Sequence, residues 1–224
     1  MSAQSGSSKS VSRAAVDWGE VAIAQALSPS IRVGPHEARP SLLEALRMGY
    51  CDEEGACTLD ETQCLLHLRY GAEKLSEQDR SIHLGWQSVR MTDEEFLAIY
   101  LYTAEFTPAS ASVYHRLNGD LIDKVRTRCR KWRFYLDLLF AALRKVPPTR
   151  MYQDLYRSVG RDLVSLSPAK YGLGCTFVEY AMVSTSCKMK VVEGFLGPEG
   201  GTIFCINGSF SARFISPYSA NPSG

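Results

Sequence analysis

Leu155-Tyr156-Arg157-Ser158-Val159 is the stretch around which the rest of the chain is organised. Leu155, Arg157 and Val159 alternate with Tyr156 and Ser158, and this period of two is typical of a half-buried β-strand. The alternation puts the arginine on one face of the strand and the tyrosine on the other. We therefore predict a strand that carries Arg157 toward a cleft.

Two further short apolar runs follow this strand. The first covers residues 182–186 and has the sequence Met-Val-Ser-Thr-Ser, and the second is Thr202–Ile206, which comes after a glycine-rich turn at residues 194–201. Both runs have the length of a strand. An arginine on one strand and a serine at the end of another can converge on one small polar pocket, and such a pocket would suit a phosphate and a ribose.

The preceding part of the chain is predicted to be helical. Thr92 and Glu95 form a capping box at the start of a helix that ends near residue 105. Two more helices are expected over residues 110–125 and 130–146, because their apolar residues recur at a spacing of three and four. Pro147-Pro148 ends the last helix, since proline cannot donate the backbone hydrogen bond and restrains the residue before it.

Weaker helical patterns cover residues 14–27, 42–48 and 58–70. The residues predicted to face inward on the helices are Leu65, Leu66, Leu68, Phe96, Ile99, Tyr100, Thr103, Val113, Leu117, Leu121, Ile122, Trp132, Tyr135, Leu136, Leu139, Phe140 and Leu143. The order of helices and then strands predicts an α+β protein. Its predicted parts are a flexible tail at residues 1–38, a helical subdomain at residues 39–148, and a strand-rich subdomain with a mixed or antiparallel sheet at residues 149–224.

Charge and hydropathy disfavour several classes of partner. The 25 basic and 24 acidic side chains give no global field that would attract nucleic acid or an anionic membrane. A basic cluster at residues 124–133 has no aromatic stacking platform beside it, so we interpret it as solvated surface. No apolar run approaches the ~20 residues of a spanning helix, and the polar N-terminus does not resemble a secretory signal. We expect a cytoplasmic protein that binds neither nucleic acid nor membrane.

The seven cysteines are interpreted as reduced thiols, because their number is odd and no secretory signal precedes them. Cys175 and Cys205 lie inside apolar patterns, where a thiol behaves as a small hydrophobe. The candidates for a zinc site lack the Cys-x-x-Cys spacing that would make a metal the better interpretation. These candidates are Cys51, Cys57, Cys64, His67 and His83.

In the order of these elements the chain resembles the arginine-type mono-ADP-ribosyltransferases, a family with an arginine strand, a Ser-Thr-Ser strand and a later Glu-x-Glu loop. Leu155–Val159 looks like the family's Tyr-Arg-Gly-Val strand, with Ser158 where glycine is usual, and residues 182–186 look like its Phe-x-Ser-Thr-Ser. Residues 195–204 are similar to the helix and strand that follow in the family, and residues 215–222 to the approach to the glutamate loop. The resemblance covers residues 92–224.

The resemblance implies an NAD-binding core that transfers ADP-ribose from NAD to an acceptor protein, with arginine as the acceptor side chain and nicotinamide as the leaving group. It implies that Arg157 holds the pyrophosphate or the adjacent ribose through charge-assisted hydrogen bonds, and that Ser184 orients the nicotinamide ribose. NAD is a substrate in this chemistry, and no metal is expected. The implied catalytic residues are Arg157 and Ser184, and the implied NAD-binding residues are Arg157, Ser184, Thr185, Ser186, Tyr156 and Phe195.

The departure from the family lies at the catalytic carboxylates. The Glu-x-Glu would follow Pro222, whereas the sequence runs to Gly224 and has no acid after Arg213. Glu193 and Glu199 precede the strand at Thr202, so neither takes that role. The chain as given is expected to have little transferase activity, and a version extended by this loop is expected to modify arginines. The alternative is a catalytically inactive NAD site or protein-interaction module.

Overall fold

The computed structural model describes residues 38–77, 81–84, 87–123, 126–146, 148–149, 154–207 and 212–220. Helices and short antiparallel strand pairs make up this part of the chain, so the α+β class predicted from the sequence is confirmed. Residues 1–37 of the predicted tail, with the possible helix at residues 14–27, lie outside the described residues.

The described residues divide into two compact units that alternate along the chain. The strand unit consists of residues 154–178 and 183–207. The helical unit consists of the described residues up to 149 together with residues 179–182 and 212–220. The domain boundaries predicted at residues 38 and 148 stay predictions, and each unit is described by itself below.

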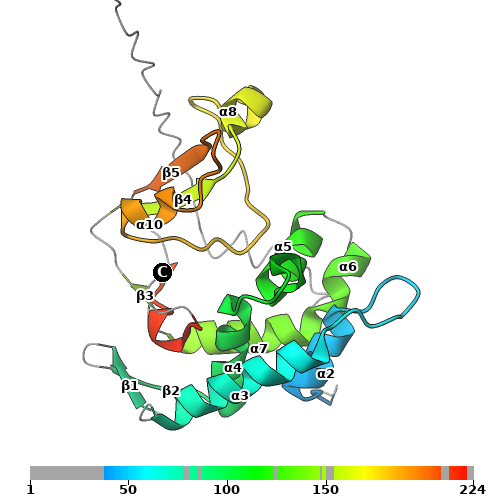
Figure 1. The fold of residues 1–224 in the computed structure, drawn as a ribbon. Coiled ribbons are helices and arrows are strands. Elements are labelled where there is room, and N and C mark those ends of the chain that lie inside the picture. Colours follow the sequence, from blue (N-terminus) through cyan, green and yellow to red (C-terminus); the bar gives the residue numbers. More distant parts are fainter. Residues whose placement is uncertain are drawn as a thin grey trace, which may run out of the picture. The chain divides into compact units, whose positions relative to one another are not determined.

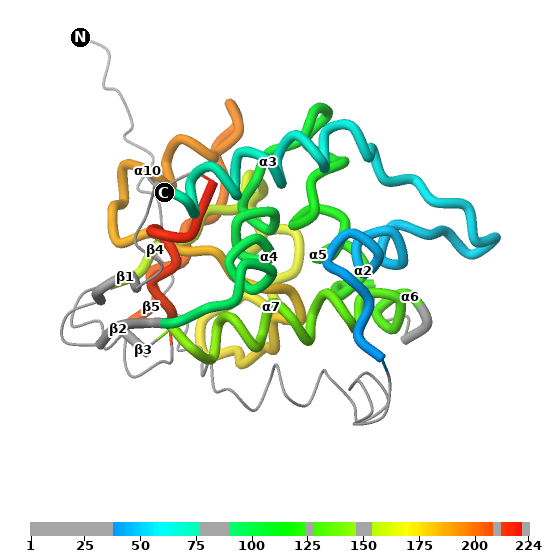
Figure 2. The backbone as a smooth tube through the Cα atoms, turned by 90° about the horizontal axis from the view of Figure 1, so that it is seen from below, coloured from blue at the N-terminus to red at the C-terminus, as the bar shows by residue number. Residues whose placement is uncertain are grey.

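Six helices of the described residues form the framework of the helical unit (Figure 1). They are α2 (Leu42–Gly49), α3 (Glu61–Glu77), α4 (Asp93–Thr103), α5 (Val113–Ile122), α6 (Arg126–Lys131) and α7 (Arg133–Lys145). Helix α4 lies between α3 and α7, and α2 packs against α7 (Figure 2). Every helix predicted over residues 42–146 is therefore present, although the predicted helix at residues 130–146 is divided at Trp132 into α6 and α7.

The start of α4 is fixed by the predicted capping box. The Thr92 hydroxyl accepts a hydrogen bond from the Glu95 amide at 3.2 Å, and the Glu95 carboxylate accepts one from the Thr92 amide at 2.7 Å. The same reciprocal pair forms between Ser41 and Glu44 at the start of α2. Each box satisfies amides that have no partner inside the helix, so both N-termini are set by local sequence.

The core of the helical unit is centred on Trp132, which is fully buried. Its ring packs edge-on against Tyr50 and Tyr135, with centroids 5.4 and 5.9 Å away. The indole Nε1 donates to the Asp120 carboxylate at 2.7 Å, so the polar atom of the ring has a partner. The buried stripe predicted for the last helix is confirmed for Trp132, Tyr135, Leu136 and Leu139.

Three inward assignments were wrong. Ile122 is 54% exposed because α5 ends at this residue. Leu65 and Leu66 are 51% and 44% exposed, since the buried side of α3 is formed by Cys64, with Leu68 packed partly against the core. Leucines occur on more than one side of α3, so their positions alone did not identify the buried face.

The strand unit is built on one antiparallel pair, β4 (Leu155–Val159) with β5 (Thr202–Ile206). Both strands were predicted at these residues. Three short helices accompany them, α8 (Leu163–Leu166), α9 (Pro168–Tyr171) and α10 (Met189–Glu193). Leu155, Ile206 and Val192 are the buried apolar residues of β4, β5 and α10.

The other strand pairs belong to the helical unit. Strand β1 (Ser81–Leu84) pairs with β2 (Gln87–Arg90), and β3 (Pro148–Thr149) pairs with β6 (Ala212–Arg213). Each sheet of the described residues has two antiparallel strands. The C-terminal residues also contact the helices, because the Ala220 amide donates to the Thr103 hydroxyl and Tyr218 is buried in the same core.

Candidate functional site

The register of β4 and β5 places Arg157 directly opposite Phe204. Directly opposed residues of an antiparallel pair project from the same face, so the guanidinium and the phenyl ring share one face of the strand pair. Tyr156 lies opposite Cys205 on the other face. The predicted alternation of β4 is therefore realised in the paired strands.

The guanidinium of Arg157 is the unusual feature of this face. The side chain as a whole is half-buried, but its Nη1 atom is buried and has no hydrogen-bond partner among the residues that the structure describes. Buried polar atoms are nearly always hydrogen-bonded, and a charged group without a partner carries a larger penalty than a neutral one. An anionic oxygen at this nitrogen would relieve that penalty.

The Ser-Thr-Ser segment meets β4 next to this arginine. The Tyr156 amide donates to the Ser186 carbonyl at 2.7 Å, and the Ser186 amide donates to the Tyr156 carbonyl at 2.9 Å. The strand expected at residues 182–186 is reduced to this single bridge. The bridge holds the end of the segment beside the residue that precedes Arg157.

The three hydroxyls of the segment lie in different environments. Ser186 is buried, and its hydroxyl accepts a hydrogen bond from the Lys188 amide at 3.1 Å just before α10. Ser184 is exposed and Thr185 is half-buried. Ser186 therefore has a structural role in ordering the chain, and Ser184 is the hydroxyl of the three that is open to a ligand.

An aromatic cluster surrounds Phe204 on the arginine face. Tyr171 and Phe177 lie with their ring centroids 6.2 and 6.0 Å from that of Phe204, and 4.9 Å from each other. The Lys170 ammonium sits 4.7 Å from the Tyr171 ring centroid. One face of the β4–β5 strand pair thus carries an arginine and an aromatic cluster flanked by a lysine.

Phe195, the remaining predicted NAD-binding residue, is 73% exposed and follows α10. Its ring contacts no other ring of the described residues. The structure therefore places Arg157 on one face of β4 and Tyr156, with Ser186 opposite it, on the other face. Ser184 and Phe195 lie on exposed chain outside the strands.

A close backbone approach shapes the end of the β4–β5 strand pair beyond Arg157. A Cβ atom on Gly201 would lie 2.2 Å from the Val159 carbonyl oxygen, so only glycine fits at the start of β5. The adjacent Thr202 hydroxyl donates to the Arg161 carbonyl and accepts from the Leu163 amide, each at 2.9 Å. These contacts fix the chain as it leaves the arginine strand.

Sequence reasoning missed the aromatic members of this face. Phe204 can be assigned to the same face as Arg157 only when the pairing of β4 and β5 is known. Tyr171 and Phe177 then join it from α9 and the following loop. The period of two in Thr202–Ile206 predicts a strand, but it does not identify the strand with which this one pairs.

The basic cluster, the candidate metal ligands and the hydropathy of the helices are the remaining features. In the basic cluster, Arg128 pairs with Glu53 and Asp123, and Lys131 pairs with Asp120. No group of three or more potential metal ligands occurs within the described ranges. Among the helices described, none combines the length and the apolar character that crossing a membrane requires.

No protein-family model, no curated protein and no solved structure matches this chain.

Proposed function

We propose that the chain binds NAD through Arg157 and Ser184, and that together with a Glu-x-Glu loop it acts as a mono-ADP-ribosyltransferase of the arginine-acceptor type. The observation that carries this proposal is the buried Nη1 atom of Arg157, which has no partner within the described part of the chain. A dinucleotide pyrophosphate supplies the anionic oxygens that such a guanidinium binds through two parallel hydrogen bonds.

The position of the Ser-Thr-Ser segment supports the same ligand. The Tyr156–Ser186 bridge fixes this segment beside β4, and Ser184 is exposed two residues before the bridge. A hydroxyl that donates and accepts hydrogen bonds is suited to a ribose diol. The proposal assigns the pyrophosphate to Arg157 and the nicotinamide ribose to Ser184.

In the proposed reaction the bond between nicotinamide and ribose C1 breaks and its electron pair leaves with nicotinamide. The ribose develops oxocarbenium character, as in glycoside hydrolysis. The acceptor guanidine then attacks C1 and loses a proton. Arg157 holds the pyrophosphate, and Ser184 holds the nicotinamide ribose. A carboxylate near C1 stabilises the cation, and the resemblance assigns this role to a Glu-x-Glu sequence.

Binding of NAD is the step that tests the proposal, because it requires Arg157 and not the catalytic carboxylates. Isothermal titration of the purified chain with NAD is expected to give saturable binding that Arg157→Ala weakens. Loss of a hydrogen bond to a charged group costs about 1.5–3 kcal/mol, a fall in affinity of about 10-fold to 150-fold.

Arg161→Ala is the matched control. It removes the same charge four residues later in the strand unit, from an exposed side chain, and is expected to leave the affinity for NAD unchanged. Equal affinity in wild type and Arg157→Ala would overturn the proposal. Transfer of label from NAD to an arginine-rich acceptor, measured with a version of the chain that carries the Glu-x-Glu loop, then separates a transferase from the inactive NAD-binding module, since both bind NAD and only the first releases nicotinamide.

A further inference from the structure

The loop after α2 brings two cysteines face to face. The Asp52 amide donates to the Ala56 carbonyl at 2.9 Å, and the Thr58 amide donates to the Tyr50 carbonyl at 3.1 Å. These two bonds flank Cys51 and Cys57, which oppose each other as an isolated antiparallel bridge. The cysteines therefore occupy a non-hydrogen-bonded pair position.

This position has the geometry that a disulfide needs. In non-hydrogen-bonded antiparallel pairs the Cα atoms are about 4.5 Å apart and the side chains lie close together. Disulfides span Cα separations of about 4.4–6.8 Å. The backbone can thus hold Cys51 and Cys57 in either the reduced or the oxidised form without moving.

The two sulfur atoms also converge on one acceptor. The Cys51 thiol donates to the Arg47 carbonyl with Sγ at 3.2 Å, and the Cys57 Sγ lies 3.7 Å from the same oxygen. Both thiols are free and reduced. Burial raises the pKa of the Cys51 thiol, and the nearby Cys57 sulfur raises it further.

We propose that Cys51 and Cys57 are a reversible thiol–disulfide pair whose oxidant is a peroxide. Cys57 is exposed and Cys51 is half-buried, so Cys57 meets the peroxide first and Cys51 is the resolving thiol. The proposal is independent of NAD binding, because both residues belong to the helical unit.

The chemistry balances with hydrogen peroxide as the only added reagent. Cys57 loses its proton and its thiolate attacks one peroxide oxygen. The O–O bond breaks, and the released hydroxide takes up that proton, so a sulfenic acid and water result. The Cys51 thiolate then attacks the Cys57 sulfur, the S–O bond breaks and the oxygen leaves as water. Two electrons pass from the two thiols to the peroxide, and a thiol reductant reverses the process.

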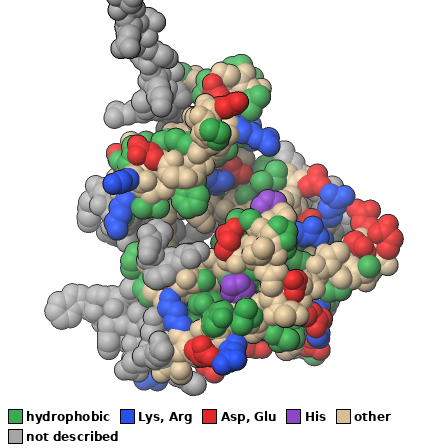
Figure 3. Space-filling model, viewed as in Figure 1, with side chains coloured by type: hydrophobic (Ala, Val, Ile, Leu, Met, Phe, Trp, Pro, Cys, Tyr) green, Lys and Arg blue, Asp and Glu red, His purple; other side chains and the backbone are tan. Residues whose placement is uncertain are grey.

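The loop between the cysteines is already in the closed conformation. The Ala56 amide donates to the Asp52 carboxylate at 2.7 Å, and Gly55 has a φ of +87°, which favours glycine at this turn. Closing the disulfide therefore requires no new ordering of the loop. Acidic side chains gather at the tip of this loop in the space-filling view (Figure 3).

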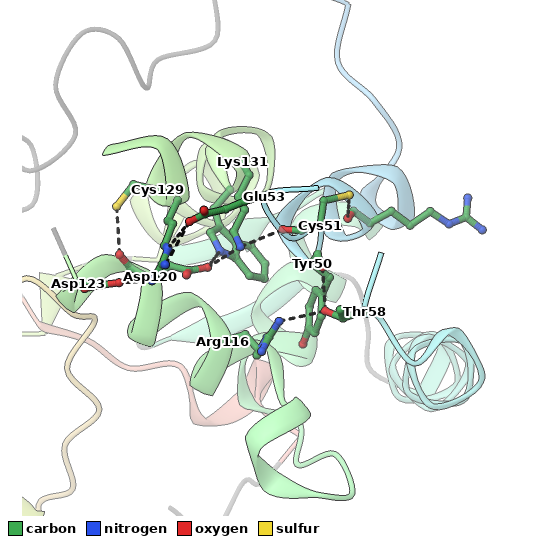
Figure 4. A network of polar contacts seen from close by, with 12 residues as sticks. Tyr50, Cys51, Glu53, Thr58, Arg116, Asp120, Asp123, Cys129 and Lys131 are labelled. Atoms are coloured by element: carbon green, nitrogen blue, oxygen red, sulfur yellow. Dashed lines mark hydrogen bonds and ion pairs between the residues drawn. The ribbon is translucent and has the colours of Figure 1, made fainter. Parts of the chain in front are cut away.

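A polar network connects the loop to the helices of the same unit (Figure 4). The Lys131 ammonium donates to the Cys51 carbonyl at 3.1 Å and also pairs with Asp120. Arg128 pairs with Glu53 at 3.1 Å. A disulfide between Cys51 and Cys57 would hold both ends of the loop and so restrict this network to its present arrangement.

The remaining cysteines of the helical unit are poorer candidates. Cys64 is fully buried, and burial raises its pKa to about 11, which leaves almost no thiolate at neutral pH. Cys129 is also buried, and its thiol donates to the Asp120 carbonyl with Sγ at 3.3 Å. The position of the Cys51–Cys57 pair is what separates it from these isolated thiols.

The experiment treats the native chain with hydrogen peroxide, blocks remaining thiols with N-ethylmaleimide, and maps peptides by mass spectrometry without reduction. The expected result is a single dominant product, the peptide pair joined through Cys51 and Cys57, with the loss of two hydrogens. Dithiothreitol should restore both thiols. The oxidised chain should melt at a higher temperature than the reduced chain.

Variants make the test specific. Cys51→Ser should leave a sulfenic acid on Cys57 that dimedone traps, and Cys57→Ser should abolish the linked product and the shift in melting temperature. Cys187→Ser removes another exposed thiol and should change neither. The proposal is overturned if the native chain yields no Cys51–Cys57 peptide, or if the yield of that peptide is no greater from folded chain than from urea-unfolded chain.

Discussion

Gly49→Ala tests the packing of α2 against the core of the helical unit. A Cβ atom at Gly49 would lie 2.3, 2.5 and 2.7 Å from the Cε3, Cζ3 and Cδ2 atoms of Trp132. Favourable contacts between carbon atoms are about 3.5–4.0 Å long. The added methyl group therefore requires α2 or the indole ring to move by about 1 Å.

The indole ring has little freedom to make that move. Trp132 is fully buried, its Nε1 is held by Asp120, and Tyr50 and Tyr135 pack on it. Overpacking of a closed core costs about 1–3 kcal/mol. Alanine regains up to about 1 kcal/mol over glycine inside a helix, but Gly49 is the last residue of α2, where that gain is smaller.

We therefore expect Gly49→Ala to lower the free energy of unfolding by about 1–3 kcal/mol, and each kcal/mol corresponds to about 2–4 °C in melting temperature for a chain of this size. Urea unfolding followed by tryptophan fluorescence measures the change. Gly119→Ala is the control, because a Cβ there meets nothing within 4 Å. It should stabilise α5 by about 0.5–1 kcal/mol. A Gly49→Ala chain as stable as wild type would refute the close packing on Trp132.

Three further changes test the fold and the site. Burial of Glu95 opposes its ionisation, but the Lys145 ammonium and the capping contacts outweigh burial and hold the pKa of Glu95 below its usual value. The ionised carboxylate therefore stabilises the folded chain above about pH 4.3, and this stabilisation is lost as the pH falls through the folded-state pKa. Glu95→Gln keeps the cap and should remove about 1 kcal/mol at pH 7 and less than that at pH 3, as followed by urea unfolding at both pH values. Trp132→Phe removes the hydrogen bond to Asp120 and part of the ring, and should cost about 2–4 kcal/mol in the same assay. Arg157→Met should leave the melting temperature of the chain without NAD unchanged or higher, while it abolishes the rise in melting temperature that NAD produces.

The helices could be predicted because their signals are local. Thr92 and Glu95 are three residues apart, and their reciprocal hydrogen bonds form within one turn. The buried stripe of α7 could be predicted equally well, because its apolar residues occupy one side of the helix. The pattern failed in α3, where the exposed Leu65 and Leu66 mask the buried face that Cys64 occupies.

The site could be predicted only in part, because strand pairing is not local. The sequence shows that Arg157 alternates with Tyr156, but not that Phe204 lies opposite Arg157. The convergence of Cys51 and Cys57 depends on a turn whose hydrogen bonds bring the two residues into register. The sequence offers both residues as candidate zinc ligands, but a zinc site needs more ligands than this pair supplies.

The effect of Arg157→Met on stability separates a ligand-binding arginine from a structural one. A structural arginine forms contacts that its removal breaks, so methionine would lower the melting temperature of the chain without NAD. A buried guanidinium nitrogen without a partner instead costs about 1–3 kcal/mol in the free protein, and methionine keeps the apolar stem while removing that charge. NAD stabilises only a chain that binds it, by RT ln(1 + [NAD]/Kd). The two hypotheses, a structural and a ligand-binding arginine, therefore predict different effects of Arg157→Met on the melting temperature of the unliganded chain. A lower melting temperature without NAD would count against the assignment even if affinity for NAD also fell, because the loss of affinity would then follow from a damaged fold.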